Sequence, residues 1–411
     1  MPSAGPPHAS RREAMGVQRV LVLGAGYAGV RAAQEMTDVL DEREIVLVDR
    51  SGSHEILTEM YRVAAGDHAR RQATVPLHRL LPHHRNLRLL QADVERIDWR
   101  RREVPTSRGP VGYDMALICL GAVPEYYGVP GAREHAMTLQ HLDSAIRLRR
   151  RLGALARRGG GRVVIIGAGL TGVELAGEIA DRHPGRLRLT IASPAHTVPP
   201  EEEAGLAAYA LRTLERSAIE VRRGESVAQV LTDGVWLTSG LRLAADLVVW
   251  TGGVRGNRLP EAAGLPVDGR GRVRVLSTLE VEGHPGLFAA GDVASVPGAG
   301  DHPLPPAAQL AVQEGRLAAR NILRLLAGAQ PEPLEPRILA VTASPVSSRG
   351  IARLGRFRLG GRTAHALDEI ALLRYLYGSG GLGLVRREAY LSLALPAAAR
   401  RPERQQAESA P

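Results

Sequence analysis

The chain has 411 residues, 44% of them hydrophobic, which is enough for two or three domains with real cores. All 53 basic side chains are arginines and the net charge is +10, but aromatic residues make up only 3%, so we expect no nucleic-acid binding. The sequence contains no run of ~18 apolar residues, so we expect no membrane-spanning segment. The single cysteine, Cys119, excludes enzymes that need a redox-active pair, and no His/Cys cluster has metal-ligand spacing.

The first motif in chain order is Gly-Ala-Gly-Tyr-Ala-Gly, which follows the apolar run 20–23 and opens a predicted helix. In a dinucleotide-binding turn, Gly24 permits the tight turn, Gly26 lets the backbone approach a pyrophosphate, and Gly29 lets helix and strand pack closely. The N-terminus of the helix offers unpaired N–H groups to the phosphates. The next predicted strand ends at Asp49, where a carboxylate that binds ribose hydroxyls is expected.

A second Gly-x-Gly-x-x-Gly motif follows the predicted strand 162–166, and its glycines are Gly167, Gly169 and Gly172. The next strand ends differently, because an Ala-Ser pair with Ser193 occupies the place of the ribose-binding acid. No arginine follows directly to receive a 2′-phosphate. The motif therefore predicts a nicotinamide-nucleotide turn, and it leaves open the choice between NADH and NADPH as well as weakened or altered nucleotide binding.

Each of the two glycine motifs is followed later in the chain by the same pattern of an acid, an apolar strand and a small-residue turn. The pattern occurs at 114–121, where it ends at Gly121, and again at 246–252. We interpret this as one architectural plan used twice, with the second unit inserted into the first. A further apolar strand ends at Gly291 and Asp292. We expect Asp292 to direct its carboxylate at the ribityl chain of a flavin whose adenosine half lies on the first motif.

The predicted fold is α/β, with two Rossmann-like, three-layer dinucleotide-binding domains, the second inserted into the first, and a small C-terminal region. The expected boundaries are a disordered tail at 1–16, an FAD-binding domain at 17–130 and 260–330, an NAD(P)H-binding domain at 131–259, a C-terminal region at 331–396 and a second disordered tail at 397–411. Apolar residues recur at helical spacing in 367–377. The C-terminal region is interpreted either as a peripheral membrane contact or as the interface of a homodimer.

These motifs resemble the two-dinucleotide-binding flavoproteins of the pyridine nucleotide–disulfide oxidoreductase superfamily, and within it most of all the type II NADH dehydrogenases. The resemblance covers roughly residues 17–330 and rests on the segments 172–178, 250–254 and 308–315. It implies bound FAD, NADH or NADPH as hydride donor, and a quinone or another small electron acceptor. A flavin carries the hydride and electron chemistry itself, so the protein must position and tune it.

Three side chains are the catalytic candidates. Glu174, expected on the first turn of its helix, could orient the nicotinamide or assist proton movement, or it could simply complement the helix dipole. Gln309 and Gln313 are four residues apart and thus on one helical face. Their amides could border the flavin and hydrogen-bond a quinone carbonyl, or they could form a solvated polar stripe. Cys119 is expected to be a small core residue.

Three functions stay open. The first is a peripheral NADH:quinone oxidoreductase on the inner face of the cell membrane, and the second is a soluble NAD(P)H-dependent flavoenzyme that acts on a small metabolite. The third is a redox-sensing flavoprotein with low turnover, suggested by the missing acid at Ser193. The near-absence of cysteine favours a reducing, cytoplasmic compartment in each case.

Overall fold

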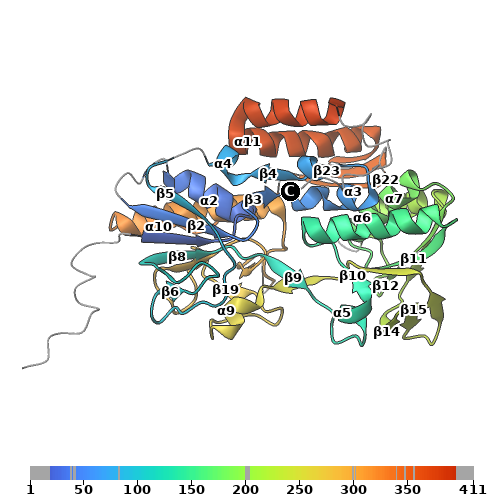
Figure 1. Ribbon diagram of the computed structural model, residues 1–411, viewed down its shortest axis with the longest axis horizontal. Helices are drawn as coiled ribbons and strands as arrows, with labels where there is room; N and C mark the ends of the chain where they lie inside the picture. The colour runs from blue at the N-terminus through green and yellow to red at the C-terminus, as the bar shows by residue number, and fades with distance from the viewer. Residues whose placement is uncertain are drawn as a thin grey trace, which may run out of the picture. The chain divides into compact units, whose positions relative to one another are not determined.

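The computed structural model describes residues 19–37, 39, 43–81, 84–199, 204–298, 300, 302–338, 340–346, 349–354 and 357–394 (Figure 1). The expected tails at 1–16 and 397–411 lie outside these residues. The chain divides into two compact units, the first made of 1–54, 75–123 and 254–338 and the second of 55–74, 124–253 and 339–411. The prediction that a second unit is inserted into the first is confirmed, because 124–253 lies between two segments of the first unit.

The first unit is built on a five-stranded sheet in the order β20-β8-β1-β2-β5, and all of its neighbouring strands run parallel. Its strands are β1 (Arg19–Leu23), β2 (Glu44–Asp49), β5 (Leu87–Gln91), β8 (Met115–Ile118) and β20 (Leu287–Ala289). The other strands of the unit or its boundaries are β3 (Ser53–Glu55), β4 (Thr74–Pro76), β6 (Glu103–Val104), β7 (Val111–Gly112), β9 (Ala122–Pro124), β18 (Val254–Gly256), β19 (Val273–Arg274) and β21 (Ala294–Ser295). Its helices are α2 (Tyr27–Thr37), α4 (Leu77–Leu80), α9 (Arg258–Ala262) and α10 (Ala308–Leu326).

Helices α2 and α10 cross at close range in the first unit. A Cβ added at Gly315 of α10 would lie only 2.1 Å from the carbonyl oxygen of Ala28 in α2, so only glycine permits this approach. Beside the crossing, Glu35 of α2 pairs with Arg316 of α10 at 2.9 Å. The helix predicted after the first glycine motif begins inside the motif, at Tyr27, and ends at Thr37.

The second unit contains another five-stranded parallel sheet, in the order β10-β17-β11-β12-β13. Its strands are β10 (Ala136–Met137), β11 (Gly161–Ile166), β12 (Leu187–Ser193), β13 (Ile219–Arg223) and β17 (Leu247–Trp250). An antiparallel sheet contains β14 (Val227–Leu231), β15 (Gly234–Leu237) and β16 (Arg242–Ala244). The helices are η1 (Leu57–Glu59), α3 (Met60–Ala65), η2 (Arg70–Gln72), α5 (Ala132–His135), α6 (Leu142–Arg157), α7 (Leu170–Arg182) and α8 (Ala204–Arg216).

The alternation of side chains along β11 explains the three layers of the second unit. Val163 and Ile165 pack into the core cluster that helices α3, α6 and α7 cover. Val164 and Ile166 point the other way, into a cluster with side chains of β14 and β15. Both faces of the sheet are thus buried, which is why β11 reads as a continuous apolar run.

The C-terminal segment forms part of the second unit. Strands β22 (Ala340–Val346), β23 (Arg349–Leu354) and β24 (Phe357–Gly361) make an antiparallel sheet, and α11 (Arg362–Ala394) follows. Helix α11 is broken at Gly380 and Gly381, where Gly381 takes a φ of +65°, and Figure 1 shows the chain folded back on itself as two helical arms. The helical spacing predicted in 367–377 lies within this helix.

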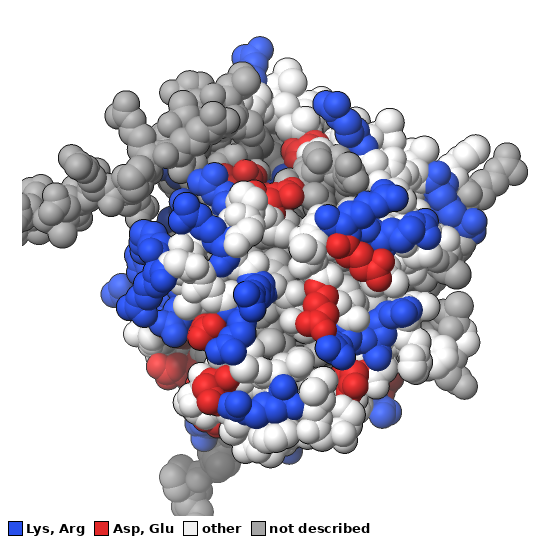
Figure 2. All heavy atoms as spheres, turned by 90° about the vertical axis from the view of Figure 1, so that its right-hand side faces the viewer, with Lys and Arg blue, Asp and Glu red and all other residues white. Residues whose placement is uncertain are grey.

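Charged side chains of both signs share the face of the molecule drawn in Figure 2. On the face shown in Figure 2, arginine and carboxylate side chains are intermingled and do not form one large basic region. In the described part of the chain, no helix combines the length and the apolar composition that crossing a lipid bilayer requires.

Candidate functional site

The first glycine turn has the backbone that a dinucleotide site needs. The N–H of Gly24 donates to the carbonyl of Val48 at 2.8 Å, and Gly24 has a φ of +97°. A Cβ added at Gly29 would lie 1.9 Å from the Gly24 oxygen, whereas one added at Gly26 would meet nothing within 4 Å. The outer two glycines are therefore required by packing, and Gly26 faces open space. That open space at the start of α2 is where a pyrophosphate would approach the backbone.

Asp49 lies at the end of β2, directly beside this turn. Its Oδ2 accepts from the N–H of Ala25 at 2.9 Å, and its Oδ1 accepts from the N–H and the hydroxyl of Ser51, both at 2.8 Å. These bonds hold the carboxylate at the carboxyl edge of the sheet, the position of a ribose-binding acid. The residues of the first turn thus fit the adenosine half of FAD.

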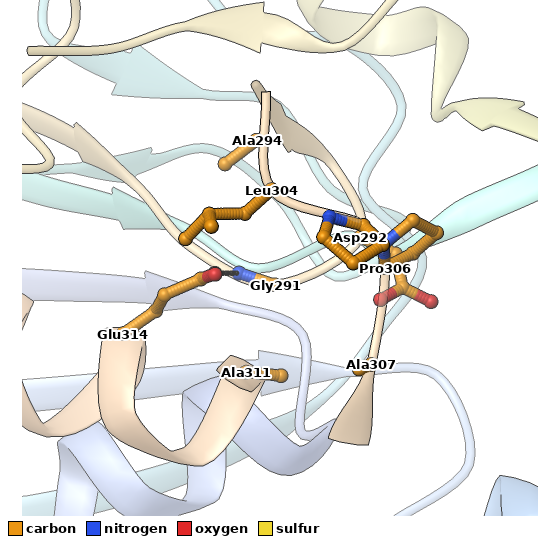
Figure 3. Close-up of a pocket in the computed structure, with 9 residues that line it drawn as sticks. Gly291, Asp292, Ala294, Leu304, Pro306, Ala307, Ala311 and Glu314 are labelled. Atoms are coloured by element: carbon orange, nitrogen blue, oxygen red, sulfur yellow. Dashed lines mark hydrogen bonds between the residues drawn. The ribbon is translucent and has the colours of Figure 1, made fainter. Parts of the chain in front are cut away.

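Strand β20 ends at Ala289, two residues earlier than predicted, and the turn that follows it holds Gly291 and Asp292 and is supported by a buried carboxylate. Gly291 has a φ of +78°, and its N–H donates to Oε2 of Glu314 on α10 at 2.6 Å. Figure 3 shows that the Asp292 carboxylate points away from Glu314, while Ala307 and Ala311 lie below the turn. A cavity of about 10 Å³ separates these groups, roughly the room that one water needs.

Glu314 is the residue of this turn that the sequence reasoning did not single out. Only 3% of it is exposed. Burial raises its pKa to about 7, opposed by the hydrogen bond from Gly291 and reinforced by the nearby Asp292. Burial also raises the pKa of Asp292, and the cationic Arg272 opposes that change. The only sequence signal for Glu314 is an acid on the face of α10 that packs inward.

The remaining residues predicted for the first site lie in or beside the same unit. Gly121 follows β8 with a φ of +67° and open space in the direction of a Cβ, and its carbonyl accepts from the N–H of Asn257 at 3.1 Å. Cys119 is buried, and desolvation raises the pKa of its thiol well above the usual range. A thiol that stays protonated is a core residue and not a nucleophile, which agrees with the prediction.

The two glutamines of α10 are not equivalent. The amide of Gln313 donates to the carbonyls of Gln309 and Arg337, both at 2.9 Å, and its oxygen accepts from the N–H of Arg337 at 3.0 Å. Gln313 therefore anchors the segment that follows α10. Its amide hydrogens are already used, which differs from the expectation that both amides are available to an acceptor. Gln309 lies half-buried on the first turn of α10.

The second glycine turn repeats the geometry of the first. The N–H of Gly167 donates to the carbonyl of Ala192 at 2.9 Å, and Gly167 has a φ of +106°. A Cβ at Gly172 would lie 2.1 Å from the Gly167 oxygen. Gly169 caps the N-terminus of α7, and the hydroxyl of Thr251 donates to the Gly167 carbonyl at 3.1 Å. These residues fit the phosphates of a nicotinamide dinucleotide.

Glu174 lies elsewhere than predicted on its helix. Because α7 begins at Leu170, Glu174 is in the second turn, and the first turn holds no acid, so the helix dipole does not explain it. One turn further, Glu178 is 3% exposed, and its Oε2 finds no hydrogen-bond partner among the described residues. Burial raises the pKa of Glu178 to about 7, with the carboxylate of Asp67 adding to the shift and Arg62 opposing it.

Next to Glu178 in the second unit lies an ion cluster around the buried Arg62, which the sequence reasoning also missed. Arg62 of α3 pairs with Glu59 at 3.2 Å and reaches Asp368 at 3.5 Å and Glu369 at 2.5 Å, both on α11. His68 adds a contact to Glu59 at 3.6 Å. Segments far apart in sequence are thus joined by one guanidinium. In the described ranges, no group of His, Cys, Asp or Glu side chains is arranged as a metal site.

The fold and these turns define a protein with two dinucleotide-binding units, one suited to FAD and one to a nicotinamide dinucleotide. Comparison with known families agrees, since residues 18–315 match the pyridine nucleotide-disulphide oxidoreductases. The chain belongs to this family, and it is an FAD-dependent oxidoreductase.

Similar proteins extend the comparison over most of the chain. It is 29% identical to a type II NADH:quinone oxidoreductase of Staphylococcus epidermidis, over 89% of this chain and 97% of that protein. Among solved structures, NDH2 from Plasmodium falciparum in complex with NADH gives a TM-score of 0.83 at 14% identity, covering 93% of this chain and 99% of that one. The sulfide:quinone oxidoreductase from Aquifex aeolicus gives a TM-score of 0.74 at 18% identity, covering 92% and 95%. At these identities the two structures support the fold.

Proposed function

We propose that the protein oxidises a reduced nicotinamide dinucleotide through bound FAD and passes the electrons to a quinone. The observation that carries this proposal is the repeated turn, with Gly24–Val48 in one unit and Gly167–Ala192 in the other making the same backbone bond. Two such turns in one chain fit a donor and a flavin. The likeness to type II NADH:quinone oxidoreductases along nearly their whole length supports a quinone as the acceptor.

Residues of the two glycine turns and of helices α7 and α10 would bind the FAD and orient the nicotinamide. FAD, when bound, supplies the chemistry that accepts a hydride and releases electrons singly or in pairs. Gly26 and Asp49 would bind its pyrophosphate and ribose, and Asp292 would bind the ribityl hydroxyls. Glu314 would hold the Asp292 turn in place through Gly291. Glu174 would orient the nicotinamide or hold a proton, with Glu178 one turn behind it on α7.

The acceptor side is assigned to the start of α10. Gln309 would contact a quinone carbonyl from the first turn, and Gln313 would fix the neighbouring segment at Arg337. Dithiol chemistry is excluded for the whole chain, because its only cysteine is Cys119. This separates the proposed reaction from that of disulfide reductases in the same superfamily.

A quinone with a long isoprenoid tail is lipid-soluble, so we propose a peripheral contact with a membrane. The C-terminal elements β24 and α11 support it, because they expose large apolar side chains: Phe357 (61%), Ile370 (57%), Tyr377 (58%) and Leu382 (60%). Co-sedimentation with anionic liposomes tests this part. A homodimer that covers the same side chains would instead stay in the supernatant with twice the mass.

The function is tested with the purified flavoprotein. An oxidised flavin absorbs at about 450 nm, and we expect this band to bleach when NADH or NADPH is added without oxygen. A short-chain soluble quinone should then restore the band and sustain turnover. Bleaching without any acceleration by quinone would replace the proposal with a flavoenzyme that acts on another small metabolite. Absence of bleaching with both donors would reject both enzymes.

A further inference from the structure

The position of the missing acid can be located from strand register. In the first unit, Leu23 pairs with Val48, so Asp49 is one residue beyond the pair. In the second unit, Ile166 pairs with Ala192, so Ser193 is one residue beyond the pair. Leu23 and Ile166 each stand directly before the first glycine of a turn. Ser193 is therefore the structural equivalent of Asp49, and it stands where a nucleotide's adenosine ribose would lie.

An arginine from the next strand stands beside Ser193. Strand β13 pairs in parallel with β12, and Arg223 is the register partner of Ser193, so both are on the same side of the sheet. Nη1 of Arg223 donates to the carbonyl of His196 in the loop after β12, at 3.3 Å. The guanidinium is thus held over the end of β12. In the first unit, the equivalent partner of Asp49 is the neutral Gln91.

A surface hollow of about 390 Å³ opens at this point, lined by His196, Val221, Arg222, Arg223 and Glu225. Arg222 pairs with Glu220 at 2.5 Å. Arg223, in contrast, has no carboxylate within ion-pair distance among the described residues. The backbone N–H of Glu225 donates to the carbonyl of Ser193 at 2.9 Å, which ties the rim of the hollow to the strand end. The hollow therefore holds the guanidinium of Arg223, which makes no ion pair with a described residue, and the carboxylate of Glu225 on the same lining.

We propose that this hollow binds the 2′-phosphate of NADPH, so that the protein prefers NADPH to NADH. The inference rests on the proposed function for the presence of a nicotinamide donor. The donor that we propose, NADPH, differs from the NADH that appears in the names of two similar proteins. A ribose-binding carboxylate would bind the free 2′-hydroxyl of NADH and repel a phosphate, and Ser193 removes it. Arg223 supplies a planar, permanent cation that can bind a phosphate through two N–H groups.

The carboxylate of Glu225 provides a further test of the proposal. Glu225 lines the same space as Arg223, so its carboxylate opposes a phosphate there. We expect Glu225→Gln to tighten NADPH binding and leave NADH unchanged. If Glu225 instead replaced the missing acid as a ligand of the ribose hydroxyls, the same substitution would weaken NADH.

Binding is tested first without turnover, with 2′,5′-ADP and 5′-AMP as probes for the adenosine half. Calorimetry on the purified flavoprotein should give a dissociation constant at least about tenfold lower for 2′,5′-ADP. Raising the salt concentration should reduce that advantage, because charges at the surface are screened. Equal affinities would overturn the proposal, whatever the flavin does. This readout stays valid even if the proposed hydride transfer fails.

Kinetics on two variants then assign the preference to these residues. We expect Arg223→Gln to lower kcat/KM for anaerobic flavin reduction by NADPH at least about tenfold and to change that for NADH less than about twofold. Ser193→Asp should reverse the preference. Arg188→Gln is the matched control, since it removes one exposed arginine from the opposite end of β12, roughly 16 Å away. An equal loss in the control, or an Arg223→Gln protein that keeps its NADPH preference, would refute the assignment.

Discussion

Gly26 and Gly29 of the first turn are needed for different reasons, and exchanging each for alanine separates these reasons. A methyl group at Gly29 would lie 1.9 Å from the Gly24 oxygen, about 1.1 Å inside the 3.0 Å that real Cβ contacts respect. The oxygen belongs to the backbone, so α2 itself must shift away from β1. We expect Gly29→Ala to cost about 2–4 kcal/mol of unfolding free energy, as overpacked sites do. In Gly26→Ala the methyl meets nothing within 4 Å, so the fold should be retained.

FAD binding, in contrast to stability, should be weakened most directly by Gly26→Ala. The methyl of Gly26→Ala would occupy the space through which a pyrophosphate approaches the backbone, and we expect FAD to bind at least about tenfold more weakly, or 1.4 kcal/mol. Both variants lose stabilisation from FAD, so they are compared with each other by thermal unfolding and by flavin content. Gly29→Ala should melt about 2–5 °C below Gly26→Ala, for a transition that involves all 411 residues. A Gly26→Ala protein that purifies with one FAD per chain would refute the reasoning.

Three further predictions follow from the buried groups. Because the folded pKa of Glu314 is raised to about 7, the protein binds more protons when folded, and its unfolding free energy should fall as pH rises from 5 to 8. Glu314→Gln keeps an acceptor for Gly291 and should remove on the order of 2–3 kcal/mol of this fall in urea unfolding; an unchanged pH slope would contradict the pKa shift. Arg62→Met should lower the unfolding free energy by about 3–5 kcal/mol, because it leaves the buried Glu59 without its arginine partner. The control Arg101→Met breaks an exposed pair 3.9 Å long and should lower it by under about 1 kcal/mol. Equal losses in the two variants would show that burial is not the cause. Cys119→Ala should keep kcat within about twofold, and a large loss would give the thiol a role in the reaction.

The glycine turns could be predicted from sequence because each is a local device. Gly24, Gly29 and Asp49 belong to one strand–turn–helix–strand unit, and the steric reasons for each residue act within it. The same reasoning placed Ser193 at the point where an acid was missing. The structure adds the register that makes Ser193 and Asp49 equivalent.

What could not be predicted depends on long-range pairing. Arg223 is adjacent to Ser193 only because β13 pairs with β12. The local sequence of either strand does not predict this order of strands in the sheet. Arg62 and Glu369 meet because α3 and α11 fold into one unit, although most of the chain separates them. Sequence spacing within a helix also misplaced Glu174 by a turn, since the start of α7 is set by Gly169.

The two turns show why nucleotide class and nucleotide identity are encoded differently. Phosphates are recognised by backbone N–H groups at a helix start, so any sequence that permits the turn provides the same site, and Gly24 and Gly167 make matching bonds. The ribose edge is recognised by side chains at strand ends, where Asp49 stands beside Gln91 in one unit and Ser193 beside Arg223 in the other. On our proposal, exchange of one charge there would change the preferred ligand without disturbing the turn. The choice of donor is therefore free to change while the flavin site is kept.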